Sequence, residues 1–508
     1  MALTSKDRIG VVGAGAMGRG IAAVAARAGH QVYLFDMDAA SALAAPALIR
    51  AEWQVLVDRG KWTAAEQDVA CARLHPVSTL AELADAALVI EAIVELAEPK
   101  QALFRALEAV LSESAILASN TSSISITTLA RGLVHPERLV GLHFFNPATK
   151  MKLVEVISGL GTDPAVVDLL CDTVRAWGKL AVRAQSTPGF IVNRVARPYY
   201  AEALRTLAEA AAQPEVIDTL LRRAGGFPMG PFELMDLIGN DVNFAVTSSV
   251  FAAMYHDGRF QPSLQQQERV AAGWMGRKTG RGFYDYRDQA ARSEPPALAR
   301  QAAPDKVRVV GDLGIAEPLL HRLQQAGLVV ERQAAQGMGY LALAGDLRLA
   351  LTDGRTATVR AAETGHANWV LFDLALDYIS TSHLALCVAD QAAAGALEHA
   401  AGLLQVAGIT ILPIDDIAGM VVMRTMAMLA NEAADAVLFG IASAADVDLA
   451  MRYGTNYPVG PLAWADGFGA ARLVQVLEAL HRHYGESRYR ISPLIRRRAA
   501  AGRGFHGA

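Results

Sequence analysis

Short apolar runs alternate with helix-length stretches in the first part of the chain. The runs predict buried strands at residues 9–12, 31–35, 88–93 and 115–118. The stretches between them are rich in Ala and Leu and predict helices, of which one ends near Gly29 and another covers residues 99–110. Strands and helices that alternate in this way predict an α/β domain built on a parallel sheet.

A glycine-rich loop joins the first strand to the first helix. It reads G-A-G-A-M-G at residues 13–18, and Asp36 closes the next strand. Strand, glycines, helix, strand and terminal acid in this order are typical of a dinucleotide site, although the glycines alone could serve only a tight turn. Asp36 can accept from ribose hydroxyls and would repel a 2′-phosphate, which favours NAD over NADP. The candidate cofactor contacts here are Gly13, Gly15, Ala16, Met17, Gly18 and Asp36.

Polar residues also follow the later strands, at the edge where cofactors bind in such sheets. Glu95 and Lys100 come after the strand predicted at residues 88–93, and the run S-N-T-S-S occupies residues 119–123. This run can be a helix cap, or it can present a hydroxyl towards the nicotinamide.

Two further strands are predicted at residues 138–144 and 153–157, around a loop that turns at Asn146-Pro147. His143 lies near the end of the first strand and Glu155 lies within the second. Adjacent strands would place a carboxylate beside an imidazole, which fixes the tautomer of the histidine and raises its basicity. Taken alone, the pair is more simply a packed histidine and an edge charge.

Together these motifs resemble the L-3-hydroxyacyl-CoA dehydrogenase family. The glycine loop, S-N-T-S-S, H-F-F-N-P, L-V-E-V and P-G-F-I-V-N-R occur in the family's order between residues 8 and 286. The resemblance implies that His143 is the catalytic base and Glu155 its partner. It also implies that Ser122 and Asn193 form hydrogen bonds at the substrate, which His143 contacts as well.

The resemblance further implies the cofactor and the reaction. Glu95, Lys100 and Asn120 would join Asp36 as contacts of NAD, and no metal would be needed. The reaction would be reversible oxidation of an (S)-3-hydroxyacyl-CoA thioester. The long layout resembles bacterial enzymes of phenylacetate breakdown, which act on 3-hydroxyadipyl-CoA, and also 3-hydroxybutyryl-CoA dehydrogenases. No residue of the sequence decides between these acyl chains.

Two other functions stay open. One is a dehydrogenase of free hydroxy acids, against which the H-F-F-N-P and L-V-E-V motifs argue. The other is a non-enzymatic NAD-binding relative of the lens crystallin type. The presence of all four expected catalytic side chains argues against that role.

The last hundred residues repeat an earlier segment. Gly189 matches Gly419 at an offset of 230 positions, and the same offset aligns several helices, which predicts a duplication. Asn193 then matches Met423, whose side chain has no hydrogen-bond donor. We therefore expect the second copy to be catalytically silent.

The expected fold class is an α/β N-terminal Rossmann-like dinucleotide-binding domain plus two all-α helical domains related by duplication, separated by a small degenerate α/β segment. The expected boundaries are 1–186, 187–289, 290–408 and 409–508, with an Ala- and Pro-rich linker at residues 292–304. Helical domains of this kind pair into dimers in the family. The second copy would then form an internal pseudo-dimer with the first, and a homo-oligomer also stays open.

The amino-acid composition limits the kinds of binding partner and compartment that we expect. A net charge of -4 and a pI near 6.3 give no electrostatic reason to expect nucleic acid or an anionic membrane. The three cysteines are far apart, which predicts a reducing compartment and no metal site. No signal-peptide pattern and no uncharged run of membrane length are found, so we expect a cytoplasmic protein.

Overall fold

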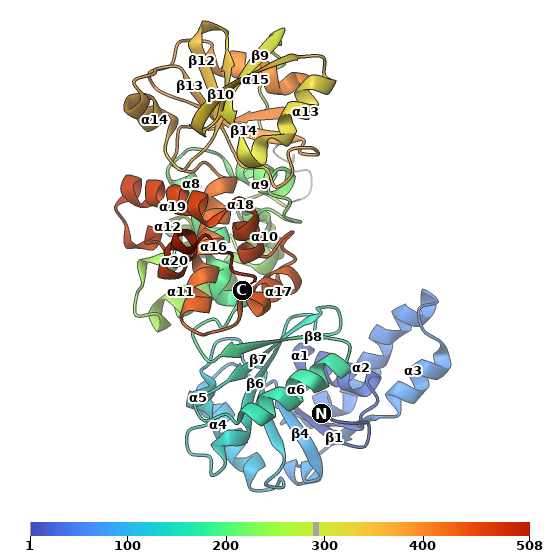
Figure 1. The fold of residues 1–508 in the computed structure, drawn as a ribbon. Coiled ribbons are helices and arrows are strands. Elements are labelled where there is room, and N and C mark those ends of the chain that lie inside the picture. The colour runs from blue at the N-terminus through green and yellow to red at the C-terminus, as the bar shows by residue number, and fades with distance from the viewer. Residues whose placement is uncertain (1, 288–293, 508) are drawn as a thin grey trace. The chain divides into compact units, whose positions relative to one another are not determined.

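The computed structural model describes residues 2–287 and 294–507. Backbone contacts divide the chain into two compact units (Figure 1). The first unit comprises Met1–Arg194 and Phe439–Thr455, and the second comprises Val195–Leu438 and Asn456–Ala508. The expected boundary between residues 289 and 290 and the first two residues of the expected linker lie outside the described residues.

An eight-stranded sheet forms the centre of the first unit, in the order β3-β2-β1-β4-β5-β6-β7-β8. Its strands are β1 (Arg8–Val12), β2 (Val32–Phe35), β3 (Leu74–Val77), β4 (Ala86–Glu91), β5 (Ile116–Ser119), β6 (Leu139–Phe144), β7 (Leu153–Ser158) and β8 (Leu180–Gln185). The strand order reverses at β1, so the loops after β1 and β4 diverge and leave a crevice where dinucleotides bind in this topology. The predicted Rossmann-like domain is confirmed.

The strands of this sheet pair in parallel except for β6 and β7. These two are antiparallel, and their register places His143 directly opposite Glu155. Side chains of directly opposed residues lie on the same face of a sheet, which allows the two to meet.

The helices of the first unit are α1 (Ala16–Arg27), α2 (Ala39–Asp58), α3 (Ala64–Cys71), α4 (Ala97–Glu108), α5 (Ile126–Leu129), α6 (Pro164–Ala176) and α17 (Ala444–Gly454). The short helix α7 (Val192–Val195) begins at the end of the segment Met1–Arg194. Residues of α1, α2, α3 and α6 share one apolar core with the strands of the sheet. Helix α17 comes from far along the chain and packs against β7 and β8. The Gln185 amide at the end of β8 donates to the Ile441 carbonyl just before that helix, at 2.8 Å.

The second unit contains its own seven-stranded sheet, in the order β10-β9-β11-β12-β13-β14-β15. Its strands are β9 (Lys306–Asp312), β10 (Val329–Met338), β11 (Tyr340–Leu343), β12 (Leu347–Leu351), β13 (Trp369–Phe372), β14 (His383–Val388) and β15 (Thr410–Pro413). Apolar runs in the segment 290–408 predict strands at residues 306–310, 347–351, 370–374 and 384–388. Strands β9, β12, β13 and β14 lie at these positions. Strands β10 and β11 were not predicted, because almost every residue of β10 is exposed and the strand lacks an apolar pattern.

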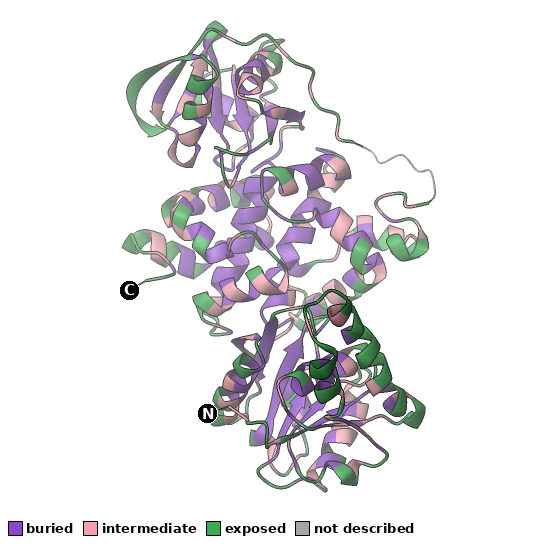
Figure 2. Cartoon of the chain, turned by 90° about the vertical axis from the view of Figure 1, so that its right-hand side faces the viewer, coloured by how far each residue is buried: buried purple, intermediate pink, exposed green. Residues whose placement is uncertain are grey.

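The second unit also holds most of the helices. They are α8 (Arg197–Ala208), α9 (Pro214–Arg223), α10 (Pro231–Ile238), α11 (Asn240–Ala253), α12 (Leu264–Ala271), α13 (Pro318–Gln325), α14 (Ala357–Thr364), α15 (Ala396–Val406), α16 (Val422–Leu438), α18 (Pro461–Phe468), α19 (Ala470–Tyr484) and α20 (Pro493–Ala501). Figure 2 shows buried residues along both sheets and in the helical layer, where α16 is buried over most of its length. No described helix is long and apolar enough to cross a membrane.

Two predicted elements need correction. After the break at Pro188-Gly189, the sequence predicts one long helix that starts at Phe190 and includes Glu202. The structure has two helices here, α7 and α8. Phe190 has a φ of +47°, which is not a helical conformation, so no helix begins there. Pro198, in the first turn of α8, has no amide hydrogen to donate to the preceding turn, so α7 and α8 do not form one continuous helix. The strand expected at residues 88–93 is β4, which ends at Glu91 because the chain then turns towards α4.

Candidate functional site

The glycine loop between β1 and α1 contains two glycines that the fold itself requires. Gly13 has a φ of +107°, and a Cβ there would lie 2.5 Å from the Ala92 carbonyl oxygen. A Cβ on Gly18 would lie 1.7 Å from the Gly13 oxygen. A Cβ on Gly15 would meet nothing within 4 Å. A tight turn therefore explains two glycines, whereas Gly15 leaves open space beside the N-terminus of α1, as a pyrophosphate requires.

Asp36, at the end of β2, lies against this loop. Its Oδ2 accepts from the Ala14 amide at 2.7 Å, and its Oδ1 accepts from the Asp38 amide at 2.9 Å. A carboxylate has further lone pairs, so Asp36 can still accept from a ribose hydroxyl. Met37, the next residue, is exposed and offers no cation for a 2′-phosphate. Ala16 and Met17 form the start of α1, where helix amides have no intrahelical partner. These residues fit NAD.

Lys100 is buried in α4 and is paired with two carboxylates. Its Nζ lies 2.5 Å from Glu91 Oε1 and 3.1 Å from Glu95 Oε2. Glu91, at the end of β4, also accepts from Ser119 Oγ at 2.6 Å. The sequence reading missed Glu91, although an acid inside an apolar strand was a visible signal that a buried cation lies nearby.

Glu95 organises the loop that carries Ser122. Its Oε1 accepts from Thr121 Oγ1 at 2.6 Å, from the Ser122 amide at 2.9 Å and from Ser123 Oγ at 3.0 Å. Partial burial opposes ionisation of Glu95, but the Thr121 hydrogen bond and the charge of Lys100 outweigh it and lower the pKa of this carboxyl. The S-N-T-S-S run is therefore a loop folded around a carboxylate.

Asn120 connects this loop to the strand that carries His143. Its amide donates to the Glu91 carbonyl at 2.8 Å, and its side-chain Oδ1 accepts from the Phe144 amide at 2.8 Å. Asn120 thus joins the ends of β4, β5 and β6. Ser122 follows β5, and His143 is the last but one residue of β6. Because β5 and β6 pair in parallel, both residues lie at the same edge of the sheet.

His143 and Glu155 form a buried hydrogen-bonded pair. His143 Nδ1 lies 2.7 Å from Glu155 Oε2, and the two side chains are 7% and 1% exposed. A carboxylate can only accept, so Nδ1 carries the proton and Nε2 presents a lone pair. The imidazole is also packed against the rings of Phe145 and Phe190. This geometry prepares Nε2 to accept a proton.

The same carboxylate holds the start of α7. Glu155 Oε1 accepts from the Ile191 and Val192 amides, both at 3.0 Å. Asn193, the next residue, is half-buried in the first turn of that helix. Glu155 therefore positions both the imidazole and the helix that carries the expected amide.

No cluster of three or more His, Cys, Asp or Glu that could hold an ion occurs among the described residues. Cys71, Cys171 and Cys387 are all free thiols.

Comparison with known proteins accounts for nearly the whole chain. Models for the NAD-binding domain and the C-terminal domain of 3-hydroxyacyl-CoA dehydrogenase match residues 8–187, and residues 189–286 and 419–504. The 3-hydroxyadipyl-CoA dehydrogenase of Escherichia coli K12 is 46% identical over 498 residues, which is 98% of each chain. The chain belongs to the 3-hydroxyacyl-CoA dehydrogenase family. The predicted family and its cofactor, NAD, are confirmed.

Other family members match the chain in whole or in part. A crystal structure of 3-hydroxybutyryl-CoA dehydrogenase from E. coli K12 has a TM-score of 0.89 at 45% identity and covers 98% of both chains. The 3-hydroxybutyryl-CoA dehydrogenase of Bradyrhizobium diazoefficiens is 42% identical over 55% of this chain and 95% of its own. A model for a reduced Rossmann-fold domain of 3-hydroxybutyryl-CoA dehydrogenase matches residues 349–417, within the second sheet.

Proposed function

We propose that the protein oxidises the 3-hydroxyl of (S)-3-hydroxyacyl-CoA thioesters reversibly, with His143 as the base. The observation that carries the proposal is the carboxylate of Glu155, which contacts His143 on one oxygen and the first turn of α7 on the other. One group thereby positions both a proton acceptor and the helix of Asn193.

In the proposed mechanism, bound NAD supplies the acceptor for the hydride that leaves the β-carbon. His143 accepts the hydroxyl proton at Nε2, since Nδ1 is committed to Glu155. Glu155 then stabilises the imidazolium. The Asn193 amide and the Ser122 hydroxyl hold the substrate oxygens. General base catalysis of this kind contributes about 10²- to 10⁴-fold to a rate.

The acyl chain we place first is 3-hydroxyadipyl, with 3-hydroxybutyryl as the alternative. A relative named for the adipyl substrate matches this chain over 98% of its length, and a solved structure of similar coverage is titled for the butyryl substrate. A 3-hydroxyadipyl-CoA substrate would place the protein in phenylacetate catabolism in the cytoplasm. The free thiols agree with a reducing compartment.

The decisive assay is consumption of NADH in the presence of acetoacetyl-CoA. Turnover supports the proposed class, whereas a free-hydroxy-acid dehydrogenase or a crystallin-like relative would leave NADH unchanged. Comparing kcat/KM on 3-hydroxyadipyl-CoA and 3-hydroxybutyryl-CoA then ranks the two acyl chains.

We also propose the four-part division at residues 186, 289 and 408, with the second half descended from the first. One C-terminal-domain model matches both helical segments, which supports duplication. The offset of 230 also relates the sheets, because β7 at Leu153–Ser158 corresponds to β14 at His383–Val388. Both strands pair antiparallel with the preceding one.

The second copy lacks the groups that the mechanism needs. At the same offset, the positions of His143, Glu155 and Asn193 hold Asp373, Ala385 and Met423. The Asp373 carboxylate accepts from the amides of Val421, Val422 and Met423 at 2.9, 2.7 and 3.0 Å. It thus performs the helix-holding task of Glu155 and leaves no base, which supports a silent second site.

The internal pseudo-dimer is supported by reciprocal contacts. The Gln185 amide donates to the Ile441 carbonyl in the first unit, and the Asp415 amide donates to the Ala211 carbonyl in the second. Residue 415 is 185 plus the offset of 230, and residue 211 is 441 minus the same offset. The two hydrogen bonds are therefore equivalent contacts with the two copies exchanged, as in a two-fold interface. Helices α8 and α16, one from each copy, also pack together in the second unit.

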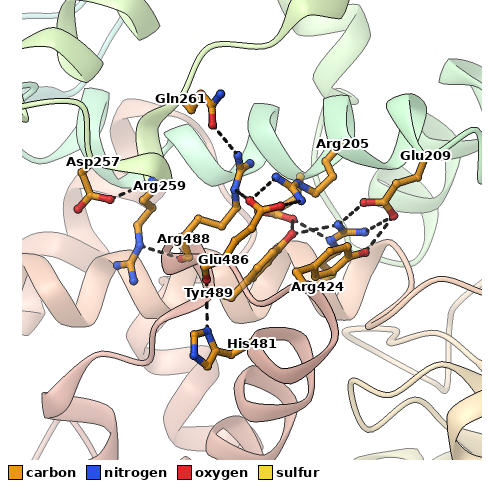
Figure 3. Close-up of polar contacts among 12 residues, drawn as sticks. Arg205, Glu209, Asp257, Arg259, Gln261, Arg424, His481, Glu486, Arg488 and Tyr489 are labelled. Atoms are coloured by element: carbon orange, nitrogen blue, oxygen red, sulfur yellow. Dashed lines mark hydrogen bonds and ion pairs between the residues drawn. The ribbon is translucent and has the colours of Figure 1, made fainter.

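Buried charges contribute to this packing (Figure 3). Arg424 of α16 donates to Glu202 of α8 at 2.7 Å and to Glu209 at 3.0 Å. Tyr489 also donates to Glu202, at 2.8 Å. An arginine this deeply buried needs such partners, so the second copy supplies a specific mate for α8.

A further inference from the structure

A pocket of about 570 Å³ lies in the second unit beside α8. Its wall combines α8 with the short turn at Gly258–Phe260, the start of α12 and two residues near the C-terminal end of the chain. The charged lining residues are Arg197, Arg205, Arg259, Arg488, Glu209 and Glu486. The lining therefore carries four guanidinium groups and two carboxylates.

Three of these arginines already have counter-ions, and Figure 3 shows the one that Arg205 and Arg488 share. Arg205 and Arg488 share the carboxylate of Glu486, at 2.8 and 3.0 Å. Arg259 lies 2.9 Å from Glu432. The second lining carboxylate, Glu209, is engaged by Arg424, as described above.

Arg197 differs from the other three. It is only 6% exposed, and among the described residues its polar contact is a hydrogen bond from Nη1 to Thr247 Oγ1 at 3.0 Å, not an ion pair. Its Nε is buried without a hydrogen-bond partner. Burial lowers the pKa of Arg197, because water no longer solvates the charge. A buried cation without a carboxylate is costly unless a ligand completes it.

The guanidinium is nevertheless held in a defined orientation. Thr247 donates its hydroxyl hydrogen to the Asn243 carbonyl at 2.9 Å, so its lone pairs face Arg197. The Tyr200 ring lies beneath the guanidinium, with 4.9 Å between its centroid and the Arg197 Cζ. Leu204 and Leu264 add apolar surface to the same lining. A fixed planar donor with some aliphatic surface beside it suits a carboxylate on an aliphatic chain.

We propose that Arg197 and this pocket form a carboxylate-binding site. The carboxylate comes either from the far end of a dicarboxylic acyl chain or from a free dicarboxylate. The first source rests on the proposed function. An arginine that reads the terminal carboxylate would distinguish an adipyl from a butyryl thioester.

The test uses full-length protein and the variants Arg197→Met, Arg197→Lys and Arg496→Met. Arg496 is an exposed arginine paired with Glu478 in the same unit and serves as the control for loss of one positive charge. One arm measures kcat/KM on 3-hydroxyadipyl-CoA and on 3-hydroxybutyryl-CoA. The other measures binding of free adipate by calorimetry, with 1,6-hexanediol as the uncharged comparison.

We expect Arg197→Met to lower the adipyl-to-butyryl ratio of kcat/KM by about 10- to 100-fold, as loss of a charged hydrogen-bonded pair should. Arg197→Lys should lower this ratio less, since lysine keeps the positive charge but lacks the paired N–H donors of the guanidinium. Arg496→Met should keep the wild-type ratio. An unchanged ratio with lost adipate binding would assign the site to a free dicarboxylate.

The proposed site is wrong if neither the kinetic comparison nor the adipate-binding measurement depends on Arg197. If Arg197→Met changes neither the ratio nor adipate binding, or if wild-type protein binds adipate no better than the diol and shows no preference, Arg197 is structural. If Arg197→Met does not fold, the lysine variant carries the same comparison. If wild-type protein turns over neither thioester, the proposed function fails, and the adipate arm still decides the site.

Discussion

Glu155 connects the expected base of the candidate site to the helix that carries Asn193. One oxygen accepts from His143 and the other accepts from two amides at the start of α7. The two contacts are separable by mutation, because a glutamine can still accept from backbone amides but cannot replace a carboxylate beside an imidazolium.

Replacing His143 with Gln should abolish most turnover. Glutamine is close in size but takes up no proton near neutral pH, so kcat on acetoacetyl-CoA should fall by about 10²- to 10⁴-fold. NADH titration should give nearly the wild-type affinity, because the glycine loop and Asp36 are untouched. Turnover above about a tenth of wild type would contradict the assignment of the base.

Replacing Glu155 with Gln should lower kcat and change its dependence on pH. The imidazolium that forms during the reaction loses the negative charge that stabilises it, so the rate should fall and its pH profile should change. The wild-type and variant profiles of kcat against pH provide the measurement. Superimposable profiles would mean that His143 acts without the dyad.

At the scale of elements, the contact of α17 with β7 joins a late helix to the first sheet. Gly454, at the end of α17, is close to two residues: a Cβ there would lie 2.7 Å from Leu153 and 3.0 Å from Val192. Val192 belongs to α7, so this contact also bears on the helix that carries Asn193.

Gly454→Ala should therefore destabilise the protein, by about 1–3 kcal/mol as typical of overpacking. Gly467, near the end of α18, offers a matched control because a Cβ there would meet nothing within 4 Å. Gly467→Ala should be neutral or stabilising by up to about 1 kcal/mol. Urea unfolding of both variants measures the difference, and equal stabilities would show that α17 does not pack tightly on β7.

At the scale of the whole molecule, the second copy is expected to serve the first as a mate. Removing residues 409–508 deletes α16, which is buried along most of its length and packs against α8. The truncated protein should expose that apolar face of α8 and self-associate. Size-exclusion chromatography with light scattering tests this, and a soluble monomer of unchanged stability would argue against the pseudo-dimer.

Much of the first unit was predictable because its signals are local. The glycine loop is one continuous motif at residues 13–18, Asp36 ends the next strand, and His143 and Glu155 lie on consecutive strands. Glu91 and the role of Glu95 in holding Ser122 were not predicted. Their partners come from α4 and from the loop after β5, which are separated from them in sequence.

The sequence by itself determined the family, the cofactor, the order of sheet and helices, and the candidate chemistry at His143. These follow from short motifs and from periodicity, which depend on neighbouring residues. Only the tertiary structure decided that Glu155 also holds α7, that α17 packs on the first sheet, and that Arg197 is buried with no carboxylate partner among the described residues. These features depend on contacts between segments that are distant in sequence. A local sequence pattern does not show whether a buried charged side chain has a partner.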